Sequence, residues 1–206
     1  MTLNNRQVNA IFERANNFMR MGNLDSAIAD YDLVIEHQPD FAPAYFNRAF
    51  ARQHGRGDLD GAIQDYDRAL ELKPGFAEAY VNRAIAHHHR GDFSAALDDY
   101  ASALDCQPQM SQAYVNRGEL HFLRGDFAAA AADFERAQAL KPGYRYAIAG
   151  LAVSLHAQDE SEESYRLWQS LMARNEGFRN ADWVRDELGW HETLVTEAQR
   201  LIAEIT

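Results

Sequence analysis

The chain has 206 residues, of which 47% are hydrophobic and 25% are charged, and its formal net charge is -11. This composition fits a folded protein with a sizeable core and excludes a largely disordered chain. The excess of acidic residues argues against nucleic acids and anionic membranes as partners, because Lys and Arg supply most of the affinity for phosphate.

The chain shows no feature of a secreted or membrane-spanning protein. Cys106 is the only cysteine, which precludes an intramolecular disulfide. The first residues lack a basic segment followed by an apolar run, and no stretch is apolar for long enough to span a bilayer. We therefore expect a cytoplasmic protein, with a signal peptide already removed as the alternative.

Internal repeats organise the chain from its first residues onward. Glycines and prolines recur at intervals of 35, 34 and 34 residues. A fixed period of this length indicates stacked units of supersecondary structure, each of which needs its neighbours to bury its apolar face. The recurring residues are Gly22, Gly57, Gly91 and Gly125, and Pro39, Pro74, Pro108 and Pro142.

Four units follow one another over residues 8–41, 42–76, 77–110 and 111–144. Each carries an aromatic residue, two small residues, a second aromatic residue, a small residue and a proline, although Ile11 replaces the first aromatic in the first unit. The second unit shows the order as Tyr45, Ala49, Ala62, Tyr66, Ala69 and Pro74, and the fourth as Tyr114, Gly118, Ala130, Phe134, Ala137 and Pro142. This order resembles the tetratricopeptide repeat family. The resemblance implies an all-α fold, a right-handed superhelical solenoid of antiparallel helical hairpins.

The turn inside each hairpin has its own pattern. The recurring glycine is expected to end the first helix in a left-handed conformation, and the next residue is expected to cap the second helix. These capping residues are Asn23, Asp58, Asp92 and Asp126. One extra residue in the second unit is predicted to lie in the loop His54–Gly57, because a longer turn disturbs stacking less than an insertion within a helix.

The pattern weakens after residue 144. We interpret residues 145–178 as a degenerate fifth hairpin, which completes an array over residues 1–178. Residues 179–206 are predicted to form a helical cap over its end, with Trp183 and Trp190 packed inside it. Cys106 occupies the repeat position of Leu72 and Leu140 and is expected to be buried.

An arginine on each first helix is followed 16 or 17 residues later by an aspartate. In the fifth hairpin both charges are replaced, by Leu151 and Leu167. Joint loss is what a pairing between the two helices of a hairpin would produce, because either charge alone would be costly there. The predicted structural ion pairs are Arg14 with Asp30, Arg48 with Asp65, Arg83 with Asp99, and Arg117 with Asp133.

A row of asparagines precedes three of these arginines. The resemblance implies that this position faces a concave groove, where a side-chain amide can hold the backbone of a bound peptide. Packing or solvation of these amides is the alternative. Neighbouring repeat positions would add an apolar stripe to the groove. The candidate partner-binding residues are Asn47, Asn82 and Asn116, with Phe12, Asn16, Phe46, Phe50, Val81, Ile85 and Val115 beside them.

No catalytic, cofactor or metal motif stands out. His191 and Glu192 lack the second histidine of a helical zinc motif, since Val195 stands at that position. The run His87–His89 cannot converge on one ion, because consecutive helical residues point about 100° apart. We expect His87 and His121 to take part in aromatic packing, and we expect neither a cofactor nor a metal.

The sequence thus predicts a non-catalytic adaptor or scaffold that binds a partner peptide or protein segment. A scaffold that self-assembles through exposed repeat ends is the alternative, and an enzyme is the less favoured third possibility. A co-chaperone that clamps a terminal carboxylate is disfavoured, because Phe12, Glu78 and Asn82 stand where the family has cationic residues.

Overall fold

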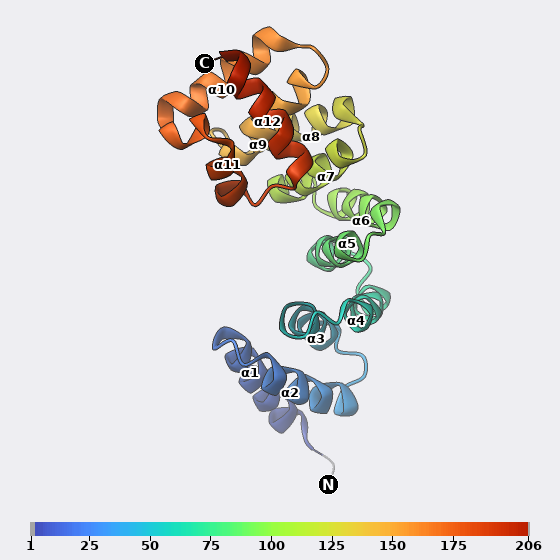
Figure 1. The fold of residues 1–206 in the computed structure, drawn as a ribbon. Coiled ribbons are helices and arrows are strands. Elements are labelled where there is room, and N and C mark those ends of the chain that lie inside the picture. The colour runs from blue at the N-terminus through green and yellow to red at the C-terminus, as the bar shows by residue number, and fades with distance from the viewer. Residues whose placement is uncertain (1–2, 206) are drawn as a thin grey trace. The chain divides into compact units, whose positions relative to one another are not determined.

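The computed structural model describes residues 3–205, and every regular element in that range is a helix (Figure 1). None of these helices has the length and apolar content needed to cross a membrane. The first ten α-helices are α1 (Asn5–Arg20), α2 (Leu24–His37), α3 (Ala42–Gly55), α4 (Leu59–Leu72), α5 (Ala77–Arg90), α6 (Phe93–Cys106), α7 (Ser111–Leu123), α8 (Phe127–Leu140), α9 (Arg145–His156) and α10 (Ser161–Arg174). The 3-10 helix η1 (Glu176–Arg179), α11 (Ala181–Leu188) and α12 (Glu192–Ile205) follow.

Helices α1 to α10 form five hairpins, in agreement with the predicted all-α array of antiparallel helical pairs. The chain divides into two compact units, Met1–Pro108 and Gln109–Thr206. The first unit holds hairpins one to three, and the second holds hairpins four and five with the C-terminal helices. The unit boundary therefore lies between the third and fourth hairpins, and residues 179–206 share a unit with the last two hairpins.

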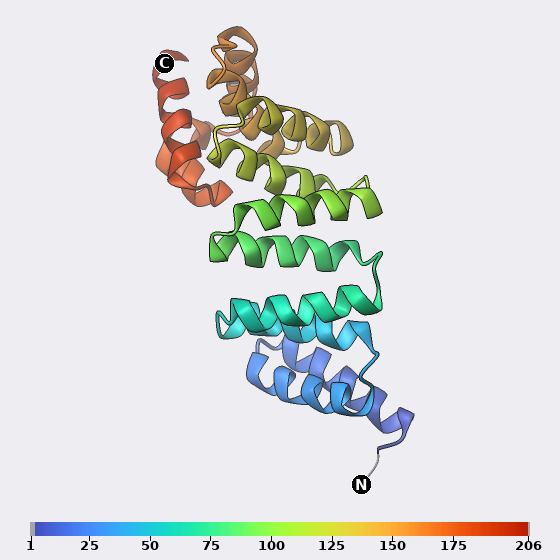
Figure 2. The ribbon, with the colours of Figure 1, turned by 90° about the vertical axis from the view of Figure 1, so that its right-hand side faces the viewer.

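Small residues and aromatic rings build the interior of each hairpin. Alanine lets paired helices approach closely, and Ala27, Ala62, Ala96 and Ala130 are all fully buried. One aromatic ring of each second helix fills the space beside them, as the repeat pattern predicts. These rings are Tyr31, Tyr66, Tyr100 and Phe134, none more than 1% exposed. Figure 2 shows the resulting layers of antiparallel helices within Met1–Pro108.

The turns confirm most of the sequence pattern. All four repeat glycines have positive φ, between +62° and +90°. Asn23 accepts a hydrogen bond from Ser26 N, and Asp58 accepts one from Gly61 N. The caps predicted at the next two turns are wrong, because neither Asp92 nor Asp126 makes a side-chain capping bond. Asp92 is bonded to Arg90 instead.

The extra residue of the second hairpin lies in its turn. The backbone bond that closes the first turn runs from Asn23 N to Phe18 O, and the third turn repeats this five-residue span from Asp92 N to His87 O. In the second hairpin the corresponding bond spans six residues, from Asp58 N to Arg52 O. The helices keep their register because the turn absorbs the insertion.

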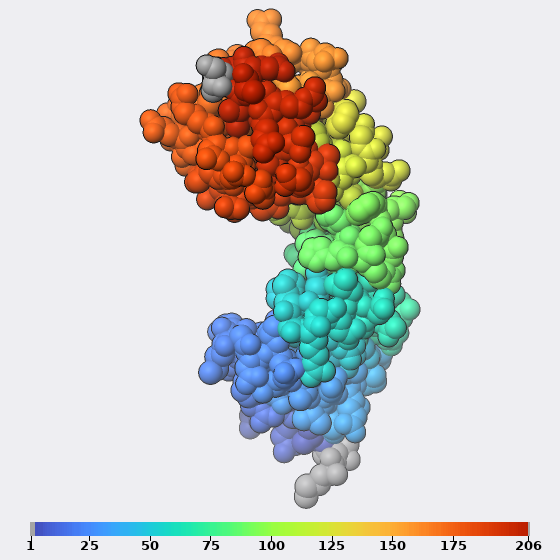
Figure 3. Space-filling view, viewed as in Figure 1, coloured from blue at the N-terminus to red at the C-terminus, as the bar shows by residue number. Residues whose placement is uncertain are grey.

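Residues 181–205 pack on the first helices of the second unit. Helix α12 contacts α9 and α7, and its residues Leu194, Val195, Ala198 and Leu201 are almost fully buried in one core with both hairpins. The C-terminal helices cover much of the face of this unit seen in Figure 3. Trp190 is buried in the same core, and Trp183 packs on Phe178.

The expectation that Cys106 is buried is wrong. Its side chain is exposed, with Sγ 4.0 Å from Pro74 O. Cys106 is the last residue of α6, and its repeat equivalents Leu72 and Leu140 are likewise only half-buried. This position lies where the second helix of a hairpin ends, so packing surrounds it on one side only.

Candidate functional site

Each of the four arginines meets its aspartate across a hairpin. Arg48 donates from Nε to Asp65 Oδ2 at 2.9 Å and from Nη2 to Asp65 Oδ1 at 2.5 Å. Such paired donation is the geometry in which a guanidinium holds a carboxylate most strongly. The pairs Arg14 with Asp30, Arg83 with Asp99, and Arg117 with Asp133 repeat this pattern, with shortest N to O distances of 2.6, 2.6 and 2.7 Å.

Two of these arginines also tie one hairpin to the preceding one. Arg48 Nη1 donates to Asp32 on α2, and Arg83 Nη1 donates to Asp67 on α4, each at 2.6 Å. Hydrogen bonding to Asp99 is the main cause that holds the pKa of Arg83 above its ordinary value. Sequence reasoning missed these links, although Asp-Tyr-Asp recurs at residues 30–32 and 65–67.

A third basic side chain joins the buried carboxylate of the second hairpin. Arg52 Nη1 lies 2.8 Å from Asp65 Oδ2. His87 holds the equivalent repeat position in the third hairpin, and its Nε2 lies 3.9 Å from Asp99 Oδ2. The expected aromatic packing of His87 is therefore wrong, and so is that of His121, whose Nδ1 lies 3.8 Å from Asp126 Oδ2. Among the described residues no cluster of His, Cys, Asp or Glu fits a metal ion.

The asparagine row makes different contacts in each hairpin. Asn47 donates from Nδ2 to Asn16 Oδ1 at 3.0 Å, and the hydroxyl of the buried Tyr31 donates to the same oxygen at 2.7 Å. Asn82 Nδ2 donates to Glu78 O of its own helix at 2.7 Å. The asparagine partner at position 16 explains the difference, because Phe50 stands there in the second hairpin and offers no acceptor.

The third amide belongs to the second unit. Asn116 Oδ1 accepts from Gln112 Nε2 of its own helix at 2.8 Å. Each of the three asparagines thus already uses part of its hydrogen-bonding capacity inside the protein. An amide can make up to four such bonds, so capacity for a visiting backbone remains.

The sequence also relates these asparagines to the buried aromatic ring of the preceding hairpin. Tyr31, Tyr66 and Tyr100 are each followed by Asn 16 residues later, whereas Phe134 is followed by Gly150. Tyr31 and Asn47 share a hydrogen bond. Asparagine thus accompanies a ring with a hydroxyl, which points to a bracing role beside any role in binding.

The apolar stripe of the first unit is only partly covered. Phe12 packs edge-on against Phe41, with ring centroids 5.0 Å apart, and Phe46 contacts Phe76 at 4.7 Å. Phe50 stacks on the exposed His54 at 4.0 Å. We call the half-buried residues on α1, α3 and α5 the first-helix surface: Phe12, Asn16, Phe46, Phe50, Val81 and Ile85.

The same repeat positions of the second unit are covered by the chain itself. On α9 they hold Ala149 and Val153, both fully buried, and the next turn adds His156, which bonds to Glu197 of α12. On α7 they hold Val115, which is 1% exposed, and Glu119, which faces Trp190. The chain thus shows that this face of a hairpin can bind a polypeptide segment.

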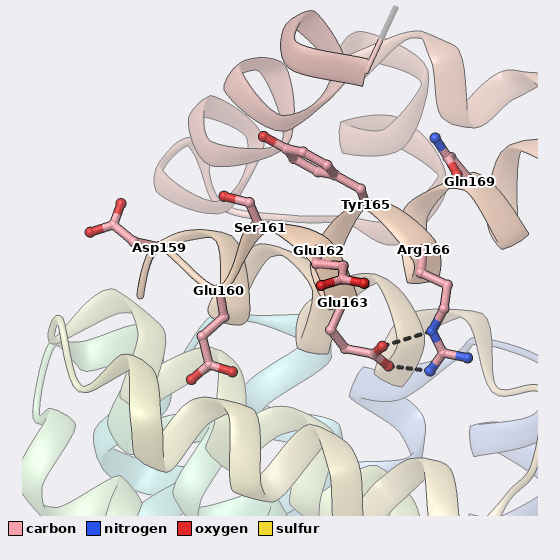
Figure 4. A pocket seen from close by; sticks show the side chains of 8 residues that line it. All are labelled: Asp159, Glu160, Ser161, Glu162, Glu163, Tyr165, Arg166 and Gln169. Carbon is pink, nitrogen blue, oxygen red and sulfur yellow. Dashed lines mark hydrogen bonds and ion pairs between the residues drawn. The ribbon is translucent and has the colours of Figure 1, made fainter.

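An acidic depression of about 1010 Å³ lies at the start of α10. Figure 4 shows its lining side chains, with Glu163 bonded to Arg166, and most of the others directed into open space. Acidic residues in a first helical turn are stabilised by the helix dipole, which accounts for Glu162 and Glu163. Asp159 takes the turn position that glycine holds in the other hairpins, with φ of +62°.

Comparison with known proteins agrees with this architecture. The sequence model of the tetratricopeptide repeat family matches residues 52–111 and 90–145. No curated protein is similar enough in sequence to match the chain.

Three solved structures share the fold. The MamA protein superposes with a TM-score of 0.75 at 19% identity, over 82% of this chain and 92% of that one. A tetratricopeptide repeat protein from Parabacteroides merdae gives 0.77 at 20% identity, over 98% and 81%. YrrB, described as a tetratricopeptide repeat protein with an unusual peptide-binding site, gives 0.68 at 17% identity, over 92% and 90%. The repeat pattern, the hairpins and these matches together identify the chain as a tetratricopeptide repeat protein.

Proposed function

We propose that the chain is a non-catalytic interaction protein, and that the first-helix surface of Met1–Pro108 binds a segment of another protein. The observation that carries the proposal is the cover on the second unit. There the chain's own C-terminal segment lies on α7 and α9 at the repeat positions that form this surface in the first unit. Within the described residues of Met1–Pro108 only α1 to α6 are present, and none of them plays the part of α12.

Side-chain size favours an extended segment as the ligand of the first unit. Helix α12 packs on Ala149 and Val153, and small residues of this kind let a second helix approach closely. The equivalent positions in the second hairpin are Phe46 and Phe50, whose rings keep a helix axis at a greater distance. An extended segment fits between such rings, and its backbone can bond to the spare capacity of neighbouring amides such as Asn82.

The surface does not favour a terminal carboxylate as the main anchor. Glu78 lies at the start of α5 and adds a negative charge there. The guanidinium groups of Arg48 and Arg83 are each bonded to two aspartates, so their charge is already compensated. Apolar side chains and backbone contacts are therefore the recognition elements of this proposal.

The test is a selection of displayed random peptides on the immobilised full-length protein, followed by measurement of Kd for the selected peptides. Phe50→Ala is expected to weaken binding about 5- to 30-fold, because truncation of a central aromatic contact typically costs about 1–2 kcal/mol. Asn82→Ala is expected to weaken it about 2- to 10-fold through the loss of one backbone bond.

Gln64→Ala is the matched control, since Gln64 is exposed on the second helix α4. It should leave Kd unchanged. Selected peptides that bind Phe50→Ala and Asn82→Ala as tightly as the unaltered protein would exclude the first-helix surface as the binding site.

A further inference from the structure

The C-terminal segment, residues 181–205, is held on α7 and α9 by buried polar groups as well as by apolar packing. Tyr146 donates from its hydroxyl to Glu187 O at 3.2 Å, and Arg145 pairs with the Glu187 carboxylate. Glu119 of α7 faces Trp190. Hairpin interfaces elsewhere in the chain are built from alanine and aromatic rings, so the polar content of this contact sets it apart.

Glu119 is the most costly of these groups when it is charged. The residue is half-buried, but its carboxyl group is desolvated, and this desolvation raises its pKa to about 7. The groups that face it are the Trp190 indole, which offsets part of the rise, and Tyr144 at the start of α9, next to Tyr146. In the described part of the chain no salt bridge to Glu119 is formed.

His156 adds a second proton-dependent contact at the other end of α12. Its Nδ1 lies 2.5 Å from Glu197 Oε1 and its Nε2 lies 3.3 Å from Glu204 Oε2, while Tyr165 donates to Glu204 at 2.5 Å. Arg200 also pairs with Glu197. Only a doubly protonated imidazole can donate from both ring nitrogens, so this arrangement is complete when His156 carries its extra proton.

We propose that residues 181–205 are a proton-held latch over a second interaction surface, formed by α7 and α9, and that the latch opens as Glu119 loses its proton. The surface beneath fits an amphipathic helix that presents aliphatic residues and a carboxylate, since α12 supplies these groups. The latch lies in the second unit and does not depend on the binding site proposed for the first.

The direction of the pH dependence follows from Glu119. A carboxyl group whose pKa is higher in the docked state than when exposed binds its proton more tightly when docked. Docking is therefore fully favoured below the ordinary value of 4.5, weakens as the pH rises toward about 7, and levels off above it. One proton released per opening changes the opening equilibrium by about tenfold per pH unit within that window.

Hydrogen–deuterium exchange of the full-length protein tests the latch. Protection of residues 192–205, after correction for intrinsic exchange rates, is compared with that of α8 between pH 5 and pH 8. Protection of α12 should fall by about tenfold per pH unit up to about pH 7, whereas α8 should stay protected. Glu119→Gln keeps the shape but removes the charge, so its α12 should keep much of its protection across this range. His156 is common to both proteins, and their difference isolates Glu119.

Glu135→Gln, on the exposed side of α8, serves as the control and should behave like the unaltered protein. The latch is overturned if α12 and α8 of the unaltered protein lose protection together, or if Glu119→Gln keeps the full pH dependence. Should Glu119→Gln fail to fold, the comparison of α12 with α8 in the unaltered protein still decides the question.

Discussion

Arg48 and Asp65 show how charge is placed inside the hairpins. Their side chains are 14% and 6% exposed, and two hydrogen bonds join them. Exposed ion pairs contribute little, because water and salt screen them and long side chains lose entropy. A partly desolvated, doubly bonded pair is expected to couple more strongly, since removal of one partner leaves a buried charge uncompensated.

A double-mutant cycle with Arg48→Gln and Asp65→Asn measures this coupling. We expect a coupling free energy of about 1–3 kcal/mol from urea unfolding followed by circular dichroism. The exposed pair Arg56 with Asp25, at 58% and 75% exposure, is the internal control and should give about 0–1 kcal/mol. Equal coupling in the two cycles would show that burial adds nothing.

Asn47 marks the limit of prediction for single residues. Its place in the repeat was evident, but repeat position alone does not say whether a polar side chain faces a ligand or a neighbour. The amide bonds to Asn16 because Asn16 stands opposite it, and this placement depends on how two hairpins pack. The 16-residue spacing between tyrosine and asparagine was present in the sequence as a sign of such bracing.

Helix α9 approaches α8 more closely than a side chain would allow. A Cβ atom at Gly150 would lie 2.4 Å from Phe134 Cε1. Phe134 is fully buried, so its ring has little room to move. The contact explains why glycine, a poor helix former, occupies the interior of α9.

Gly150→Ala is therefore expected to lower the free energy of unfolding by about 1–3 kcal/mol through overpacking. The measurement is urea unfolding, with Gly75→Ala as the matched control. No atom lies within 4 Å of a Cβ placed at Gly75, so that change should alter stability by less than about 0.5 kcal/mol. A Gly150→Ala protein as stable as the Gly75→Ala protein would contradict the close packing.

Local pattern predicted the helices well but not the docking of the last one. Small residues, rings, glycines and prolines recur at one period, so each hairpin is specified by residues close in sequence. The apolar face of α12 was also visible, since Leu194, Ala198 and Leu201 share it. The surface that covers this face was not, because the partners of α12 lie far away in sequence: His156 and Glu197 are 41 residues apart.

Across the whole molecule, one face of the repeat serves two purposes. In Gln109–Thr206 it carries the chain's own C-terminal segment, and in Met1–Pro108 it presents aromatic and aliphatic groups beside amides. The sequence predicted a solenoid with one continuous groove and a cap at its end. The structure instead gives the C-terminal segment a place on the first helices of the second unit, which leaves the first unit as the proposed site for a partner.

The central claim is that a partner segment binds the first helices of Met1–Pro108. Hydrogen–deuterium exchange of the full-length protein, with and without a saturating peptide from the display selection, tests it most directly. The account predicts added protection in α3 and α5, with Phe50 and Ile85 in the protected peptides, and little change in α4 and α6. Protection confined to the second helices, to the turns or to residues 181–205 would contradict it.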